Sequence, residues 1–246
     1  NKMISLNDEG ELKCLDLISK NDCWTYSVIP SSGAGKLIFG GGLTFDENNT
    51  LYVTTSYGEV LALSIKDGTL IWRFKVEAPI LDAPTIVGND IYITDASSIS
   101  KSLSQDGKIN WSLKGVSTSH IRSNIGSPVQ LGNTLLLPSS SGILLAVDIA
   151  TGKKQWSFHF NRYKMGYTRN IFGAFNGNPI VYENIIYFGN VNGQFNALKA
   201  NGDMLWQAPY GIEGSPLLVS NSLFLVSDTN DLIRLNKEDG SLIWSR

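Results

Sequence analysis

The residue types that carry most enzymatic chemistry are few in this sequence and poorly placed for it. His120 and His159 are the only histidines in 246 residues, and neither has a second ligand at a metal-binding spacing. Nothing in the sequence argues for a Ser-His-Asp site. The glycine run at 40–42 lacks the lysine and the helix that a phosphate-binding loop needs. The sequence therefore predicts a non-enzymatic protein, with no catalytic residue, no bound cofactor and no metal.

The two cysteines, Cys14 and Cys23, are the remaining reactive side chains. Each lies in a strand-like segment, on either side of a turn. If the hairpin has the register expected for Asp148 and Lys153 in a later segment, the two cysteines lie opposite each other on adjacent strands. A cross-strand disulfide is then one interpretation, although strand spacing often fits a disulfide poorly. Two buried free thiols are the alternative.

Composition excludes several classes of function. The formal net charge is −2, so the chain has no overall basic character of the kind that nucleic-acid or anionic-membrane binders show. Apolar residues make up 42% and charged residues 17% of the chain, which is typical of a globular protein. No apolar run approaches the roughly 18 residues that a membrane-spanning helix needs. We therefore expect no nucleic-acid partner.

A tryptophan recurs in one local context throughout the chain. The gaps between successive tryptophans are 48, 39, 45, 50 and 38 residues, and a glycine lies four residues before five of the six. This spacing predicts structural tryptophans, each of which packs between neighbouring repeats. They are Trp24, Trp72, Trp111, Trp156, Trp206 and Trp244.

The elements that position these residues are short β-strands. Each repeat reads as β-rich runs separated by glycine-containing turns, such as Leu51–Thr54 followed by Glu59–Leu63, and no stretch has a helical period. Four-stranded repeats of about 40 residues predict an all-β fold, a β-propeller. We assign one propeller domain over 1–246, with about six repeats of which the first is partial. Their approximate ranges are 1–28, 36–76, 80–115, 124–160, 175–209 and 212–246.

The recurring G-x-L-x-A-L-D-x-x-x-G-x-x-x-W pattern resembles the repeat of PQQ-like propellers. Longer blocks, from Gly40 to Asp46 and from Leu51 to Leu63, resemble the BamB family of outer-membrane assembly lipoproteins, in particular its alphaproteobacterial members. The resemblance covers nearly the whole chain. It implies an eight-bladed propeller, of which about six blades are present here.

The resemblance also implies a function. The protein would be a periplasmic, outer-membrane-associated scaffold of the machinery that inserts β-barrel proteins, and it would bind the POTRA region of the central barrel subunit. Nascent barrel proteins are further candidate partners. Its membrane contact would be a lipid anchor that this chain does not contain, since the sequence begins in a strand-like segment.

In the BamB family the partner surface uses an L-x-L-R connection and an acidic D-x-D pair in the next connection. Here Ile121 and Arg122 match the final apolar-arginine pair, with His120 beside them. In the second connection Phe175 and Asn176 are the candidate contacts, and Asn176 stands where an acid would be. The missing acids put the electrostatic half of that interface in doubt.

Two other functions remain as alternatives. A generic PQQ-like propeller would bind another protein or a ligand. A quinoprotein dehydrogenase would need a catalytic aspartate, calcium ligands, a tryptophan beneath its cofactor and often a vicinal cysteine pair. The sequence has no such cysteine pair, and all six tryptophans are assigned to packing. Several acids lie in hairpin turns, where turn geometry explains them: Asp106, Asp203 and Asp239.

Overall fold

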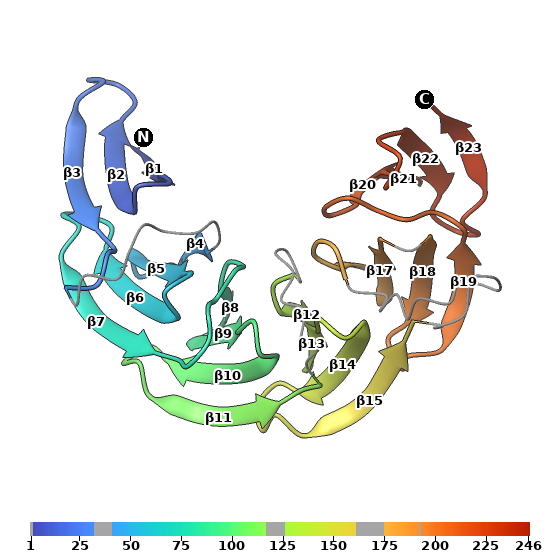
Figure 1. Cartoon of the computed structure of the whole chain (residues 1–246), viewed down its shortest axis with the longest axis horizontal. Helices are drawn as coiled ribbons and strands as arrows, with labels where there is room; N and C mark the ends of the chain where they lie inside the picture. Colours follow the sequence, from blue (N-terminus) through green and yellow to red (C-terminus); the bar gives the residue numbers. More distant parts are fainter. Residues whose placement is uncertain (1, 32–40, 117–125, 161–174, 192) are drawn as a thin grey trace. The chain divides into compact units, whose positions relative to one another are not determined.

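A computed structural model describes residues 2–31, 41–116, 126–160, 175–191 and 193–246. The chain divides into two compact units, residues 1–112 and 113–246, and every regular element in the described ranges is a β-strand. Within those ranges, no helix has the length and apolar character needed to cross a bilayer. Figure 1 shows the strands grouped into successive sheets along the chain.

The first unit contains three antiparallel sheets. The first sheet has three strands, β1 (Lys2–Leu6), β2 (Glu11–Asp16) and β3 (Asp22–Ser27). The second has four, β4 (Gly41–Phe45), β5 (Thr50–Thr55), β6 (Glu59–Ser64) and β7 (Leu70–Lys75). The third has β8 (Thr85–Val87), β9 (Asp90–Thr94), β10 (Ile99–Ser104) and β11 (Ile109–Lys114).

The second unit contains three four-stranded sheets. The first comprises β12 (Val129–Leu131), β13 (Thr134–Pro138), β14 (Ile143–Asp148) and β15 (Lys154–His159). The next comprises β16 (Ile180–Tyr182), β17 (Ile185–Asn190), β18 (Gln194–Lys199) and β19 (Met204–Ala208). The last comprises β20 (Leu217–Val219), β21 (Ser222–Val226), β22 (Leu232–Asn236) and β23 (Leu242–Ser245). The prediction of an all-β fold built from four-stranded repeats is confirmed.

The cores lie between successive sheets of each unit. In the four-stranded sheets the second and third strands are the most buried, and their apolar side chains pack on neighbouring sheets of the same unit. Leu12 and Cys14 of the first sheet meet Leu61 and Leu63 of the second, and all four are fully buried. In the second unit Leu136 and Leu144 pack with Ile186 in the same manner. Burial on both faces explains why these strands read as nearly continuous apolar runs.

Four tryptophans join a sheet to the next one within the same unit. Each indole Nε1 donates a hydrogen bond to a backbone carbonyl of the following sheet. The pairs are Trp24 to Ile65 O (3.0 Å), Trp72 to Gln105 O (2.6 Å), Trp156 to Ala200 O (3.0 Å) and Trp206 to Lys237 O (3.1 Å). The two other tryptophans pack on aromatic rings of their own sheets, Trp111 on Tyr92 and Trp244 on Phe224.

In four repeats the glycine four residues before the tryptophan is the surface that receives the preceding indole. Gly68 has φ +73°, and a Cβ there would lie 2.7 Å from Cδ2 of Trp24. Gly240 stands in the same relation to Trp206, with a Cβ 2.5 Å from Cε3. Only glycine satisfies both the positive φ and the close approach, so the recurring glycine and the recurring tryptophan are two halves of one contact.

A second recurring feature lies in the turn between the second and third strands of each four-stranded sheet, and in the turn between β1 and β2 of the three-stranded first sheet. A side-chain oxygen at the start of the turn accepts the backbone N–H four residues later, at 2.8–3.2 Å. The acceptors are Asn7, Thr55, Asp95, Ser139, Asn190 and Ser227. Because only an acceptor oxygen is required, the residue type varies from sheet to sheet.

Asp95 is the one charged member of this set. Its Oδ1 accepts the N–H groups of Ser97 and Ile99, both at 2.9 Å. Its Oδ2 is buried and finds no hydrogen-bond partner among the described residues. Burial raises the pKa of Asp95 above the ordinary value, against the lowering effect of the turn's hydrogen bonds. Folding therefore disfavours the charged form of Asp95 relative to the unfolded chain.

Asp95→Asn is expected to stabilise the protein at neutral pH by about 1 kcal/mol, since an amide keeps the Oδ1 bonds and removes a buried charge. Because the pKa of Asp95 is raised in the folded state, its carboxyl group contributes stability to the wild type below the unfolded pKa of 3.8. This contribution is lost as pH rises through the folded pKa. The gain should therefore vanish near pH 3 and reach a plateau at neutral pH. Urea unfolding of both proteins across this range measures it; a difference independent of pH would contradict the assignment.

An ion pair within the second sheet also contacts the first sheet through its arginine. Arg73 on β7 donates from Nη1 to Glu59 Oε2 on β6 at 2.9 Å, and from Nη2 to the Tyr26 hydroxyl on β3 at 3.3 Å. The Glu59 side chain is 5% exposed and that of Arg73 is 28% exposed. Arg73 thus compensates a carboxylate that has almost no access to water.

Candidate functional site

The predicted contact residues fall into two groups. His120, Ile121 and Arg122 lie outside the described residues. Phe175 and Asn176 lie in the connection that leads into β16.

The prediction that Phe175 contacts a partner is wrong. Its side chain is 2% exposed, and its backbone forms an isolated bridge with Asn190. The ring stacks on Phe188, with centroids 5.5 Å apart, and lies 4.9 Å from the ring of Phe160. A ring held on several sides by other aromatic side chains belongs to the core, and its role is to anchor the connection.

Asn176, the next residue, is directed to the neighbouring connection. Its Nδ2 donates to the backbone O of Ile212 at 3.2 Å and to Glu213 Oε2 at 3.0 Å. Glu213 is exposed. The structure therefore places a carboxylate beside Asn176, although the sequence lacks an acid at position 176 itself. Sequence reasoning missed this residue because it compared each connection only with its own counterpart.

The backbone around Glu213 is held on both sides. Ile212 N donates to Asn190 O at 2.9 Å, and Glu213 N donates to Val226 O at 2.8 Å. Ile212 also forms an isolated bridge with Ser227, and its side chain is buried. Glu213 thus projects from a fixed backbone, which limits the conformational entropy lost when a partner binds.

Two further exposed acids lie in the turn next to Glu213. Asp228 N approaches Gly211 O at 3.4 Å, and Asp231 Oδ2 accepts the hydroxyl of Thr229 at 2.7 Å. None of Glu213, Asp228 and Asp231 forms an ion pair with a described residue. This loop end of the last sheet is therefore acidic, and it suits a partner with basic side chains.

Close backbone packing fixes the connections relative to one another in the second unit. A Cβ at Gly177 would lie 2.3 Å from the carbonyl carbon of Gly214. Asn178 accepts the N–H of Ser127 through Oδ1 at 2.7 Å and donates its own N–H to Ser215 Oγ at 2.8 Å. One asparagine thereby ties together the connections into three successive sheets.

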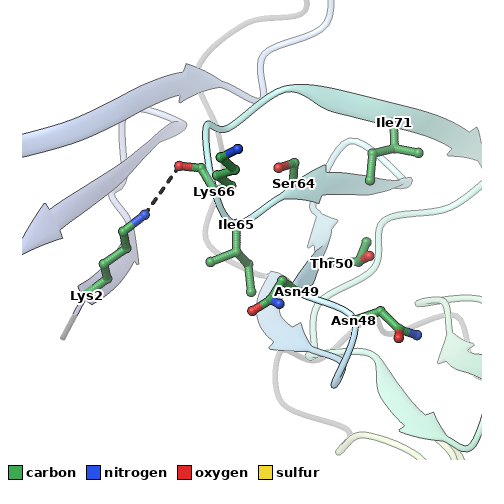
Figure 2. A pocket seen from close by; sticks show the side chains of 8 residues that line it. All are labelled: Lys2, Asn48, Asn49, Thr50, Ser64, Ile65, Lys66 and Ile71. Atoms are coloured by element: carbon green, nitrogen blue, oxygen red, sulfur yellow. Dashed lines mark hydrogen bonds between the residues drawn. The ribbon is translucent and has the colours of Figure 1, made fainter.

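A separate hollow of about 670 Å³ lies in the first unit (Figure 2). Lys2 reaches across it and donates from Nζ to the backbone O of Lys66 at 3.3 Å. The remaining lining residues are Asn48, Asn49, Thr50, Ser64, Ile65 and Ile71. The lining presents amides and ammonium groups that could bind an acidic group. It contains no carboxylate, histidine or cysteine, so it lacks a general acid–base pair.

Both cysteines are free thiols, with Cys14 buried and Cys23 exposed. The predicted register holds at Asp148, whose N–H donates to Lys153 O, but a bulge then shifts the pairing by one residue. The same bulge places Cys14 opposite Trp24 and leaves Cys23 as the extra residue. Sequence reasoning therefore had the register wrong. Burial first, and then the hydrogen bond and charge of Cys23, raise the pKa of Cys14 to about 11.

The described residues contain no group of three or more histidine, cysteine, aspartate or glutamate side chains able to hold a metal ion.

Comparisons with known proteins give one consistent family. The family model described as "Outer membrane protein assembly factor BamB" matches residues 8–246. Relatives with the same description come from Yersinia pestis, 20% identical over 97% of this chain, and Moranella endobia, 23% identical over 97%. The chain spans only 62% and 63% of the length of these two relatives.

Among solved structures, the crystal structure of BamB from Moraxella catarrhalis superposes with a TM-score of 0.86 at 18% identity. The match covers all of this chain and 72% of the other. This likeness shows that the sheets are the blades of a β-propeller.

Proposed function

Because this chain belongs to the family of the outer membrane protein assembly factor BamB, we propose that it is a non-catalytic, periplasmic scaffold of the machinery that inserts β-barrel proteins. The observation that carries the proposal is the match of the family model to residues 8–246. The relatives' names describe an assembly factor, which supports a binding role. Because this chain spans less than two thirds of the length of these relatives, the proposed function is that of the whole protein.

The partner that we propose is the POTRA region of the central barrel subunit. Arg122 and Ile121 supply a cation and an apolar contact, with His120 beside them. Arginine suits this role because its guanidinium binds carboxylates and carbonyls with two parallel hydrogen bonds. Asn176 positions Glu213 for a basic group of the partner, since its amide holds one carboxylate oxygen and leaves the group exposed.

Calorimetric titration of the full-length protein with the cognate POTRA region tests this proposal. Arg122→Glu is expected to weaken binding more than tenfold, about 1.4 kcal/mol or more. Glu213→Lys is expected to weaken it about tenfold, and more strongly at low salt, because the charges are screened as ionic strength rises.

Glu47→Lys is the matched control. Glu47 is exposed in the turn between β4 and β5, the end of its sheet opposite to the incoming connection, and the substitution changes charge by the same amount. Its affinity should equal that of wild type. If Glu47→Lys and Glu213→Lys weakened binding equally, the change in net charge would explain the effect, and Glu213 would have no specific role. A wild-type protein that does not bind would overturn the proposed partner.

A further inference from the structure

The bulge in the β2–β3 hairpin brings the two cysteines together. In a β-bulge two residues of one strand face a single residue of the other. The pairing runs Cys14 to Trp24 and then Leu15 to Asp22, so Cys23 is the additional residue on β3. Cys14 therefore faces both Trp24 and Cys23 across the hairpin.

The third sheet shows that side chains at these two positions reach each other. Ser102 is the fourth residue of β10, as Cys14 is the fourth residue of β2. Asn110 directly precedes Trp111, as Cys23 directly precedes Trp24. Asn110 Nδ2 donates to Ser102 Oγ at 3.1 Å. The repeat thus places the side chain of the residue before the tryptophan on that of the fourth residue of the adjacent strand.

We propose that Cys14 and Cys23 are a disulfide-forming pair, in which exposed Cys23 reacts first with an external disulfide and buried Cys14 then closes the bond. In the first step the Cys23 thiolate attacks the external disulfide, forms a mixed disulfide and releases one thiol. In the second step Cys14 loses its proton to solvent and attacks Cys23 Sγ, which releases the second thiol. Two protein thiols are oxidised, and one external disulfide is reduced to two thiols.

The surroundings of the pair determine the order of the steps. Cys14 is fully buried beneath the apolar side chains Leu61 and Leu63 of the second sheet, so no external disulfide reaches it in the native fold. The charged groups acting on Cys14 are Lys2 on β1 and Asp16 on β2, which have opposite effects on its pKa. Beside Cys23, Asp22 is paired with Lys13 at 2.9 Å.

The pKa of Cys14, about 11, makes closure the slow and pH-dependent step. Well below that value the thiolate fraction rises about tenfold per pH unit, and the closing rate should rise with it between pH 7 and pH 9.

The experiment treats the reduced full-length protein with oxidised glutathione and follows its mass. We expect one glutathione adduct on Cys23, replaced within hours by an adduct-free protein that has lost two hydrogens. The midpoint of thermal unfolding of this product should be about 5 °C above that of the reduced protein.

Two variants separate the steps. Cys14→Ala places at this position the residue found at Ala62 and Ala146 of other sheets, so it should fold and keep the glutathione adduct on Cys23. Cys23→Ser should form no adduct while native. The proposal would be overturned if the glutathione adduct of the wild-type protein persisted at pH 9 as it does in Cys14→Ala. A first adduct on Cys14 would overturn it as well.

Discussion

Replacing Trp24 by alanine is expected to lower the free energy of unfolding by about 3–5 kcal/mol, the range for removing a buried aromatic side chain from a core. The indole is 9% exposed, lies against Gly68 and donates to Ile65 O at 3.0 Å. Alanine would leave a cavity between two sheets and a carbonyl without its donor. Urea unfolding followed by circular dichroism measures the loss.

Ile18→Ala is the control for this substitution. Ile18 is 75% exposed in the turn that precedes β3, and its truncation should change stability by no more than about 0.5 kcal/mol. If Trp24→Ala behaved like Ile18→Ala, the indole contact would have no structural importance.

The glycine side of the same contact can be tested separately. Gly68→Ala adds both backbone strain at φ +73° and a clash with the indole, and we expect a loss of about 1–3 kcal/mol. Gly88 also has a positive φ, +59°, but a Cβ there would meet nothing within 4 Å. Gly88→Ala therefore measures strain alone. The double variant Trp24→Ala/Gly68→Ala should lose less stability than the sum of the two single-variant losses, because the clash disappears when the ring is removed.

The second large effect is expected at the buried ion pair of the first unit. Arg73→Met should lower the free energy of unfolding by about 2–4 kcal/mol, because Glu59 keeps a charge that has lost its compensating cation. The value lies below that for a fully buried pair because 28% of the Arg73 side chain reaches solvent. Thermal and urea unfolding at pH 7 measure it.

Two comparisons decide whether burial is the cause. The pair Lys13–Asp22 has the same 2.9 Å separation as Arg73–Glu59, but its side chains are 45% and 49% exposed. Lys13→Met should therefore lower the free energy of unfolding far less than Arg73→Met does. Arg73→Met combined with Glu59→Leu should recover most of the loss, since no charge remains buried. A double variant as unstable as Arg73→Met alone would attribute the loss to packing.

Much of the fold could be predicted because its determinants recur as residue types. The tryptophan, its glycine and the apolar third strand repeat at fixed spacing, since each indole needs a surface without a Cβ. The bulge before five of the six tryptophans was not foreseen, because one extra residue in a strand requires no particular side chain. That single residue is the reason that the register of Cys14 and Cys23 was wrong by one position.

The candidate site was less predictable because its contacts join different segments. Phe175 reads as a loop residue by position, but the rings of Phe160 and Phe188 from two other segments pack against it. Glu213 gains its significance only from Asn176, which lies 37 residues earlier. The Arg73–Glu59 pair likewise joins two strands diagonally, and no other repeat has an arginine directly after its tryptophan. Such contacts become visible only when the strands and connections are placed beside one another.

The variable turn acceptor has a consequence for how this repeat is recognised in other chains. Asparagine, threonine, aspartate and serine alternate there, so a scoring matrix built on residue letters would count the column as uninformative. A scoring scheme based on atom types would find a side-chain oxygen at this position in every repeat. Divergent copies that have lost their tryptophan could still be detected by this column, because alanine, valine or leucine would leave the turn N–H without its side-chain acceptor.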